Sequence, residues 1–297
     1  MTKPPGSWPD DAASMLQLHV HFTDPAAAEP AALAHLWPVL VGAEEAGHLA
    51  HWHFVRKGDR WRLRYQPGPG TGPHTVEAAL TGALAAARAA GPVTAWTRVV
   101  YEPEVLAFGG TSGLDAAHDL FHRDSRHVLA HLAGHRGPDR RRELAVLLAT
   151  ALLRGAGQEW YEQGDVWARV AAHRPAPDPA QANRLTPAVQ RLMSVDTAPD
   201  PAQANRLTPA VQRLMSVDTG PGSALATGTL AFAAPWIDTH TLAGQELRRL
   251  AHDGHLTRGL RAVCAQHLLF HFNRLGLPPI AQGVLATTAG RVVFGQE

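Results

Sequence analysis

The chain has 297 residues, which is enough for one large domain or two modest ones with a substantial core. Apolar residues make up 45% of it and the formal net charge is +1, so the composition is globular and excludes a general attraction to nucleic acid or anionic membranes. The one cysteine, Cys264, excludes an intrachain disulfide, the N-terminal stretch lacks the apolar core of a signal peptide, and no apolar run approaches the ~20 residues of a membrane span. We therefore expect a cytoplasmic protein with neither nucleic acid nor membrane as a partner.

Strand patterns dominate the first third of the chain. Residues 14–22, SMLQLHVHF, alternate in polarity and predict a strand. Two β-rich runs within 48–70 flank Lys57-Gly58-Asp59 and favour a hairpin. The other segments of this third are an Ala-rich, partly helical stretch punctuated by prolines at 24–47, a helix ending at a glycine cap at 74–91, and a strand at 93–105.

From Leu114 onward the chain is mostly helical in pattern. The expected helices lie at 114–134, 138–173, 239–252, 257–274 and 278–289. Strands first and helices afterwards predict an α+β fold with an N-terminal β-rich part and a largely helical C-terminal part. We expect residues 1–297 to form a single domain.

A 22-residue segment, APDPAQANRLTPAVQRLMSVDT, occurs twice without change, at 176–197 and 198–219. Solenoid repeats diverge and need about three copies to bury a core. Two identical copies instead indicate a recent tandem duplication in a surface loop, where an insertion costs little. Each copy is expected to hold one short helix, beginning at Thr186-Pro187 and at Thr208-Pro209.

Histidine is abundant, with 18 copies, so some pairs reach suggestive spacings by chance. The pairs on expected strands are spaced i, i+2 and those on expected helices i, i+4: His19/His21, His51/His53, His118/His122 and His127/His131/His135. The helical spacing suits a metal ion, but neither an H-E-x-x-H motif nor a cysteine cluster accompanies it. Solvated or hydrogen-bonded histidines are the favoured interpretation, and no metal site is expected.

Arginines alternate along the second hairpin strand. Arg60, Arg62 and Arg64 are expected to project from one face, and Arg56 lies across the hairpin, where it can join them. Aligned guanidinium groups suit carboxylates, phosphates or peptide carbonyls. The alternative is the solvated outer face of an amphipathic strand, and spacing alone does not decide between the two.

Two further stretches carry ionisable residues. In YEPEV, Glu102 and Glu104 are expected to share a strand face with Tyr101 opposite; they suit either a general acid or salt bridges to the arginines. FGGTSG then predicts a turn into a helix that Ser112 caps. At the other end of the chain, HLLFHFNRLGLPP places His267, His271, Asn273 and Arg274 before a Gly276 helix stop.

Three segments, in this order and spacing, resemble one family: FVRKGDRWRLRY, YEPEVLAFGGTSGLDAAHDLFHRDS and HFNRLGLPP. They are similar to the glutamate-elimination domain of lantibiotic dehydratases and to its free-standing relatives in thiopeptide biosynthesis. The resemblance runs from about Met15 to the C-terminus, outside the duplicated segment. It implies an elimination-domain-like fold and action on ribosomally made peptides that carry a leader.

The family divides into lyases and pyridine synthases. Lyases remove glutamate from glutamylated Ser or Thr, whereas pyridine synthases join two dehydroalanines by a formal aza-[4+2] cycloaddition and then release water and the leader. The resemblance implies that a lyase carries Arg-Tyr-Gly-Gly where this chain has Ala107-Phe108-Gly109-Gly110, and a histidine where it has Leu269. The first-motif arginines remain as Arg62 and Arg64. These departures favour the pyridine synthase branch.

That branch implies roles for particular residues. Glu104, with Tyr101 or His271, is expected to move protons at the reacting amide. Arg56, Arg62 and Arg64 are expected to hold substrate carbonyls or the leader's acidic residues. The other expected substrate-binding residues are Glu102, Asn273 and Arg274. Trp52, Trp61 and Trp236 are candidate surfaces for stacking thiazole rings, although core packing is favoured for any one of them. Neither cofactor nor metal is expected.

The expected partner is a leader–core precursor peptide carrying azoles and dehydroalanines, with transient contacts to other enzymes of the pathway. Three alternatives stay open: a glutamate-eliminating lyase of a split dehydratase, a non-catalytic scaffold that binds the leader, and a histidine-dependent metalloenzyme unrelated to peptides. Consumption of a glutamylated peptide, leader binding without turnover, and metal analysis distinguish them in turn.

Overall fold

The computed structural model describes residues 15–134, 139–174, 204–217 and 231–295. The chain divides into two compact units. The N-terminal unit comprises residues 1–103 and 121–135, and the C-terminal unit comprises residues 104–120 and 136–297. Helix α4 (Thr111–Gly134) therefore contributes its first half to the C-terminal unit and its second half to the N-terminal unit.

The N-terminal unit is built on a four-stranded antiparallel sheet with the order β2-β3-β1-β4. The strands are β1 (Leu16–Phe22), β2 (Leu49–Lys57), β3 (Arg60–Pro67) and β4 (Val93–Val99). As the sequence predicts, β2 and β3 form a tight hairpin around Gly58-Asp59, and Gly58 takes a positive φ of 62° that favours glycine.

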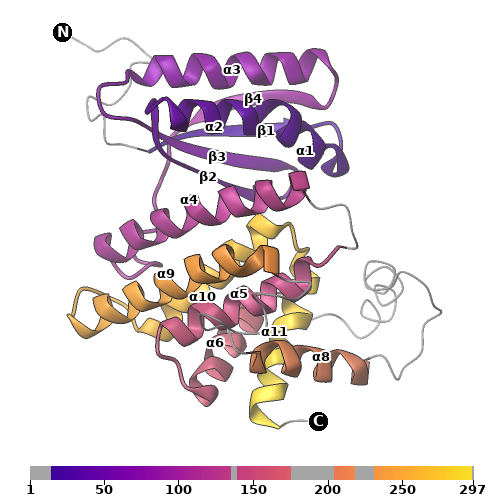
Figure 1. The fold of residues 1–297 in the computed structure, drawn as a ribbon, viewed down its shortest axis with the longest axis vertical. Helices are drawn as coiled ribbons and strands as arrows, with labels where there is room; N and C mark the ends of the chain where they lie inside the picture. The colour runs from indigo at the N-terminus through magenta and orange to yellow at the C-terminus, as the bar shows by residue number, and fades with distance from the viewer. Residues whose placement is uncertain (1–14, 135–138, 175–203, 218–230, 296–297) are drawn as a thin grey trace. The chain divides into compact units, whose positions relative to one another are not determined.

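Helices of the same unit lie along one side of this sheet (Figure 1). They are α1 (Pro25–Ala31), a π-helical turn (Ala32–Leu36), α2 (Trp37–Glu45) and α3 (Pro73–Ala89). Leu18, Leu63 and Tyr65 of the sheet and Leu80 and Leu84 of α3 are all buried. The Ala-rich segment is thus helical almost throughout rather than in parts, since the π-helical turn joins α1 directly to α2 and Pro30 lies inside α1.

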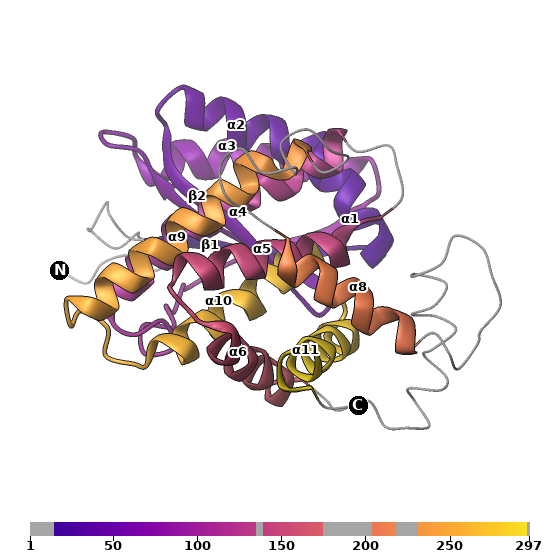
Figure 2. The same ribbon diagram turned by 60° about the horizontal axis from the view of Figure 1, so that its bottom comes forward.

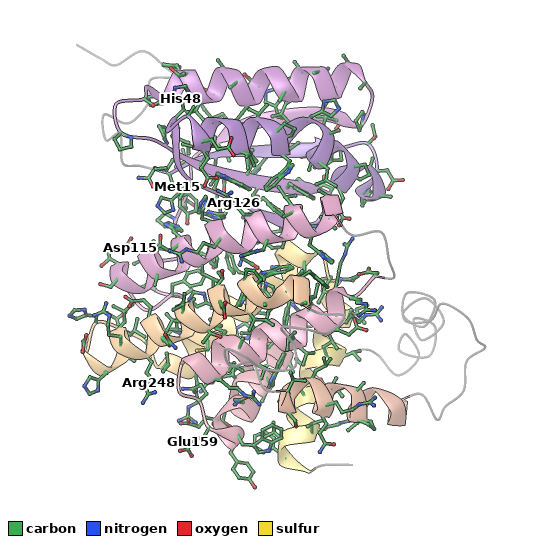
Figure 3. The ribbon with its side chains drawn as sticks, viewed as in Figure 1. Met15, His48, Asp115, Arg126, Glu159 and Arg248 are labelled. Atoms are coloured by element: carbon green, nitrogen blue, oxygen red, sulfur yellow. The ribbon has the colours of Figure 1, made fainter. Side chains whose placement is uncertain are left out.

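One edge of the sheet is covered by the second half of α4. The backbone N–H of Phe54 on β2 donates to Ser125 Oγ at 3.2 Å, and the backbone nitrogen of Trp52 lies 3.2 Å from His122 Nδ1. Glu44 of α2 forms an ion pair with Arg126 of α4, labelled in Figure 3. Side chains from α4 therefore take up polar backbone groups that an edge strand otherwise leaves unpaired.

The C-terminal unit is helical in the part that the structure describes, which confirms the α+β prediction. Its helices are α5 (Arg141–Gly155), α6 (Trp160–Ala172), α8 (Ala204–Ser216), a 3₁₀ turn (Ala231–Ala233), α9 (Ala234–His252), α10 (Leu260–Leu275) and α11 (Pro279–Phe294). They are seen end-on and side-on in Figure 2. The central helix, α5, is buried at every position from Leu144 to Leu153.

Two sequence predictions in these regions were wrong at their boundaries. The helix expected at 138–173 is two helices, because Gly157 takes a positive φ of 71° and α6 restarts where the Glu159 N–H donates to Glu162 Oε2 at 2.9 Å. The strand expected at 93–105 ends at Val99. Its partner β1 begins at Leu16, and the last pair of the ladder joins Gln17 to Val99, so the ladder does not extend to Glu102 and Glu104.

The second copy of the duplicated segment contains helix α8. This helix begins at Ala204, four residues before Thr208, and buries Val211 and Met215. Arg154 of α5 donates to the Met215 carbonyl at 2.7 Å. This part of the duplication therefore packs against the unit as a helix instead of forming an exposed loop, while residues 175–203 and 218–230 lie outside the described residues.

Candidate functional site

The arginines of β3 share a sheet face with the polar side chains of β1. The register pairs His21 with Arg60, His19 with Arg62 and Gln17 with Arg64. Directly opposed residues of an antiparallel pair project from the same face, so these six side chains form one polar strip, here called the basic strip. The sequence alternation in LQLHVHF already carried this signal, although the pairing itself was not predictable from it.

Burial increases along the basic strip. The Arg60 side chain is 39% exposed, Arg62 is half-buried and Arg64 is 4% exposed. A fully solvated outer face, one of the two sequence interpretations, is therefore wrong at Arg64. The Nε of Arg62 has no hydrogen-bond partner among the described residues, so its guanidinium retains donor capacity for a carbonyl or carboxylate.

Arg64 is held in place from two sides. Its Nε donates to Gln17 Oε1 at 2.7 Å, and its guanidinium carbon lies 4.5 Å from the centre of the Tyr101 ring. A cation over an aromatic face at this distance is attracted by the ring quadrupole. The structure thus brings together Tyr101 and Arg64, two of the residues that the sequence suggested.

Arg56 does not join the basic strip. It pairs directly with Trp61, on the opposite sheet face, and its guanidinium carbon lies 4.6 Å from the Trp61 ring centre. It also forms an ion pair with Glu29 of α1. The expectation that Arg56 would join the other arginines is corrected by the hairpin register: opposite residues share a face, and Trp61 faces the helices.

The positive charge of the strip acts on its own histidine. The pKa of His19 is lowered, first by burial and then by Arg62, Arg60, His21 and Arg64. His19 therefore stays neutral at neutral pH. The strip then presents guanidinium charges next to an uncharged imidazole.

Glu102 and Glu104 lie in an exposed connection after β4 rather than on a strand face. In the C-terminal unit, Gln266 of α10 donates from Nε2 to Glu104 Oε2 at 2.9 Å. The Glu104 carbonyl accepts from the Ala107 and Phe108 amides at 3.0 and 3.2 Å, which closes a turn. A side-chain contact and a backbone turn therefore position an otherwise exposed carboxylate.

The Gly109-Gly110 turn is anchored by the segment before α10. Gly109 and Gly110 have positive φ values of 83° and 101°, and the Gly109 carbonyl accepts from the Thr257 amide at 2.8 Å. Arg258 donates to the Ala107 carbonyl at 2.9 Å. Helix α4 begins at Thr111, so Ser112 lies inside the helix and is not its cap.

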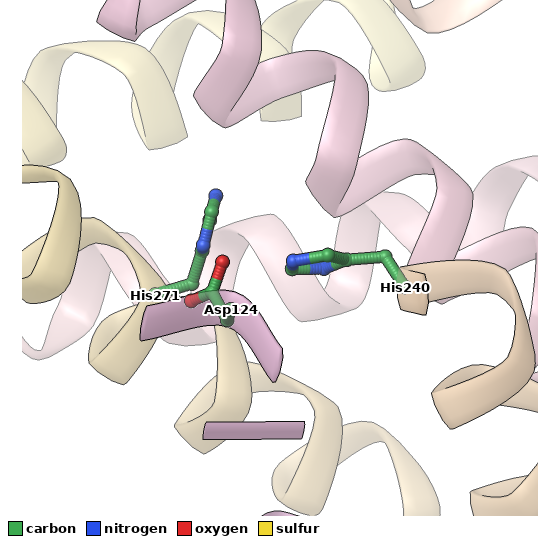
Figure 4. Close-up of side chains that lie close together, drawn as sticks. All are labelled: Asp124, His240 and His271. Carbon is green, nitrogen blue, oxygen red and sulfur yellow. The ribbon is translucent and has the colours of Figure 1, made fainter. Parts of the chain in front are cut away.

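His271 is a buried residue of α10 and packs against α9 of the same unit. Its ring centroid is 4.6 Å from that of His240 on α9, at an interplanar angle of 70°. Both side chains are labelled in Figure 4. Both histidines are at most 2% exposed. The ring centroid of Trp236 lies 6.2 Å from that of His271. Asp124, also labelled in Figure 4, belongs to the N-terminal unit. His240 was missed by the sequence reasoning because only folding brings α9 alongside α10.

The surroundings of Asn273 and Arg274 indicate a role in the fold. Asn273 Oδ1 accepts from Gln282 Nε2 at 3.0 Å, and the same amide of Gln282 donates to the Leu277 carbonyl at 2.6 Å. These bonds hold the junction of α10 and α11. Arg274 is fully buried. Gly276 ends α10 with a φ of 78°, as the sequence predicted.

The three candidate stacking tryptophans are core residues. Trp52, Trp61 and Trp236 are 0%, 5% and 2% exposed. Trp61 stacks on Phe54 with ring centroids 4.5 Å apart. Their proposed use as surfaces for thiazole rings is therefore wrong, and the favoured alternative, core packing, is what the structure shows.

Two further groups are removed from acid–base or nucleophilic chemistry by burial. Burial raises the pKa of the Cys264 thiol to about 12, so it stays neutral. Burial also lowers the pKa of His122, against the opposing influence of the Trp52 backbone and Glu44. His122 Nδ1 lies 3.0 Å from the Trp52 carbonyl, so this histidine of an i, i+4 pair contacts the sheet edge.

His267 should make stability depend on pH. Burial, then Arg274 and His240, lowers the pKa of His267 to about 3 from an ordinary value of 6.5. Between these values the unfolded chain binds the proton that the folded chain does not, so stability rises with pH in this window and is lost as pH falls through it. At pH 5 this effect lowers the free energy of unfolding by about 2 kcal/mol relative to pH 7.

Chemical denaturation at pH 7 and pH 5 of the native chain and of His267→Leu measures this effect. The native chain should lose more stability on acidification than the variant, by the amount given above. An equal loss in both proteins would contradict a depressed pKa at His267.

The sequence of the chain matches the family model described as "Lantibiotic biosynthesis dehydratase C-term" over residues 16–293. The chain belongs to this family. No curated protein matches it by sequence. Its membership supports a role in the modification of ribosomally synthesised peptides. Among the described residues, no helix combines the length and hydrophobicity needed to cross a membrane.

Three solved structures share the fold of this lantibiotic dehydratase C-terminal family member. The tRNA-dependent lantibiotic dehydratase MibB from Microbispora sp. 107891 matches at 18% identity and a TM-score of 0.60, over 96% of this chain and 28% of MibB. TsrL matches at 18% identity and a TM-score of 0.57, over 94% of each chain. The pyridine synthase TbtD from thiomuracin biosynthesis matches at 15% identity and a TM-score of 0.57, over 95% of this chain and 98% of TbtD. The family member thus spans less than a third of MibB.

The two positions at which this family member departs from the expected lyase pattern are structurally well defined. Leu269 is 5% exposed. Beside Ala107, Phe108 is 1% exposed and its ring packs edge-on against His267 and Phe270, with centroids 5.1 and 5.2 Å away. Apolar packing occupies Leu269 and Phe108, and neither Ala107 nor Leu269 offers a group that can donate a proton or bind glutamate.

Proposed function

We propose that this chain is a pyridine synthase, which joins two dehydroalanines of a leader-bearing thiopeptide precursor by a formal aza-[4+2] cycloaddition. The observation that carries the proposal is the pair Ala107 and Leu269, which stand where the family resemblance implies an arginine and a histidine in lyases. A chain without those two groups lacks the polar chemistry of glutamate elimination. TbtD, a pyridine synthase by name, matches along 98% of its own length.

The reaction needs positioning more than it needs reactive groups. One dehydroalanine and its amide, in the iminol tautomer, form the azadiene, and the second dehydroalanine is the alkene that adds across it. Holding the two parts in register supplies roughly 7–11 kcal/mol of the barrier. Loss of water and of the leader as its amide then gives the aromatic pyridine. Each atom is accounted for without an oxidant.

Tautomerisation of the amide requires a proton to leave nitrogen and another to reach oxygen. In this proposal Glu104 exchanges these protons, because its carboxylate is exposed and held by Gln266 at 2.9 Å. Tyr101 and His271 are the other candidates, although His271 is only 2% exposed.

Binding of the substrate falls to the basic strip. Arg62 would hold peptide carbonyls or acidic side chains, since guanidinium groups present several donors in a fixed plane. Arg64, which is 4% exposed and donates to Gln17, would support the strip from within. Glu102 is exposed in the connection before Glu104 and would contact cationic or amide groups of the peptide. Asn273 and Arg274 are better explained by the α10–α11 junction and by burial, so they would support His271 instead of touching the substrate.

Mass spectrometry of the purified protein with a linear, azole-bearing leader–core peptide containing two dehydroalanines tests the proposal. The expected result is a pyridine macrocycle and an intact leader amide, formed without added metal or nucleotide. Consumption of a glutamylated peptide instead would assign a lyase. Leader binding with neither reaction would assign a scaffold.

A further inference from the structure

The two edge strands of the sheet in the N-terminal unit, β2 and β4, differ in what contacts their outer sides. On β2, the amide nitrogens of Trp52 and Phe54 each lie 3.2 Å from a side-chain acceptor of α4. On β4, no strand pairs on the side away from β1 within the residues that the structure describes. An uncovered edge is a template for another extended chain, and proteins usually block it with charge, proline or a covering element.

The side chains of β4 do little to block its edge. Thr94, Ala95, Thr97 and Arg98 are exposed, and Val100 beyond the strand is 83% exposed. The strand VTAWTRV contains no proline and carries charge only at Arg98. Its β-branched residues are those that strands prefer. This edge is therefore suited to pairing with a peptide.

The rows that cross the sheet from β4 lead into the basic strip. Ala95 pairs with His21, which pairs with Arg60, and Thr97 pairs with His19, which pairs with Arg62. Ala95 and Thr97 are small, so a long acidic side chain on an added strand can pass over them toward the strip. Cations outnumber carboxylates around these rows: Lys57, Arg60, Arg62 and Arg64 stand against Asp59.

We propose that β4 binds an acidic, extended segment of the leader peptide as a fifth strand of the sheet. Backbone hydrogen bonds along the edge would supply affinity, and carboxylates aimed along the rows toward the basic strip would supply register. The identity of the peptide rests on the proposed function, whereas the docking mode rests on the sheet edge alone.

Hydrogen–deuterium exchange of the full chain with and without the leader, cut from its core, locates the contact. Amides of residues 93–100 should exchange more slowly when the leader is present, and amides of β2 should not change. Protection confined to other segments would overturn the proposal. Protection of 93–100 without leader, growing with protein concentration and accompanied by a dimer mass, would assign the edge to a second copy of the chain and would also overturn it.

Fluorescence anisotropy with the labelled leader tests the contribution of charge to leader binding. Ala95→Glu should weaken binding about fivefold or more, and the matched Ala95→Lys should bind as well as the native chain or better. A leader with its acidic residues changed to glutamine should lose this discrimination. Equal affinity of both variants for the acidic leader would refute the arrangement.

Failure of this inference and failure of the proposed function are distinguishable. Leader binding is measured without a core peptide, so it does not require turnover. If the inference holds and the chain is a cyclase, Ala95→Glu should raise KM and leave kcat unchanged. Leader bound at β4 by a chain that never cyclises would remove the cyclase and keep the docking mode.

Discussion

Replacing Glu104 with glutamine is expected to slow cyclisation by roughly 10²- to 10⁴-fold, the usual contribution of a positioned acid–base group. Glutamine has nearly the same volume, and its carbonyl oxygen can still accept from Gln266, which lies 2.9 Å from the carboxylate. The substitution thus removes proton transfer and keeps the turn that spans residues 104–110. Single-turnover mass spectrometry with the dehydroalanine peptide measures the rate of ring formation.

The matched control is Asp115→Asn, which removes another exposed carboxylate of the same unit, labelled in Figure 3. It should cyclise at the native rate. Leader affinity should be native in both variants, because neither residue lies on the β4 edge. Native turnover by Glu104→Gln would take Glu104 out of the mechanism and leave Tyr101 and His271 as candidates.

Replacing Gly244 with alanine is expected to lower the free energy of unfolding by about 3 kcal/mol, at the upper end of the usual cost of overpacking. A Cβ at Gly244 would lie 2.2 Å from the Leu152 carbonyl oxygen and 2.7 Å from the Ala156 nitrogen. These are backbone atoms of α5 and of its C-cap residue, which cannot rotate away. Gly155 on α5 is equally close to α9, with its Cβ position 2.3 Å from the Thr241 carbonyl oxygen. The two helices approach so closely that only glycine fits.

Gly82→Ala is the matched control, since Gly82 lies inside α3 and a Cβ there meets nothing within 4 Å. Because alanine has a higher helix propensity than glycine, this variant should be more stable by about 0.5–1 kcal/mol. Denaturant unfolding of the three proteins, followed by circular dichroism, measures both changes. Gly244→Ala should also slow cyclisation if His271 participates, because His240 lies one helical turn before Gly244 on α9. Native stability of Gly244→Ala would show that α5 and α9 can move apart at little cost.

Local sequence signals predicted most of the elements. The hairpin at Gly58-Asp59, the helix α3 and the end of α10 at Gly276 follow from turn glycines and from the spacing of apolar residues, which act within a few positions. One misplaced boundary had a local cause. Gly157 was in view, but a single glycine does not by itself end an element, since neighbouring contacts decide whether it is tolerated.

The candidate site was less predictable than the fold. Tyr101 and Arg64 were both suggested, but their contact depends on β3 and β4 lying on either side of β1 in one sheet. Arg56 was assigned to the wrong face because the strand pairing, not the spacing along one strand, determines which residues across a hairpin point the same way. The pair His240 and His271 and the contact of Gln266 with Glu104 join residues 31 and 162 positions apart, and no local pattern marks such pairs.

The sequence by itself determined the α+β class, most helices and strands, and a family membership carried by three short motifs, because each depends on residues close together in the chain. Tertiary structure alone decided which groups are accessible. His122 and Ser125 reach Trp52 and Phe54 from about 70 positions away and cover one edge of the sheet, whereas no described strand pairs with the outer side of β4. Coverage of an edge, like the close approach of α5 and α9, depends on packing between segments that are distant in sequence, and periodicity and turn chemistry carry no information about it.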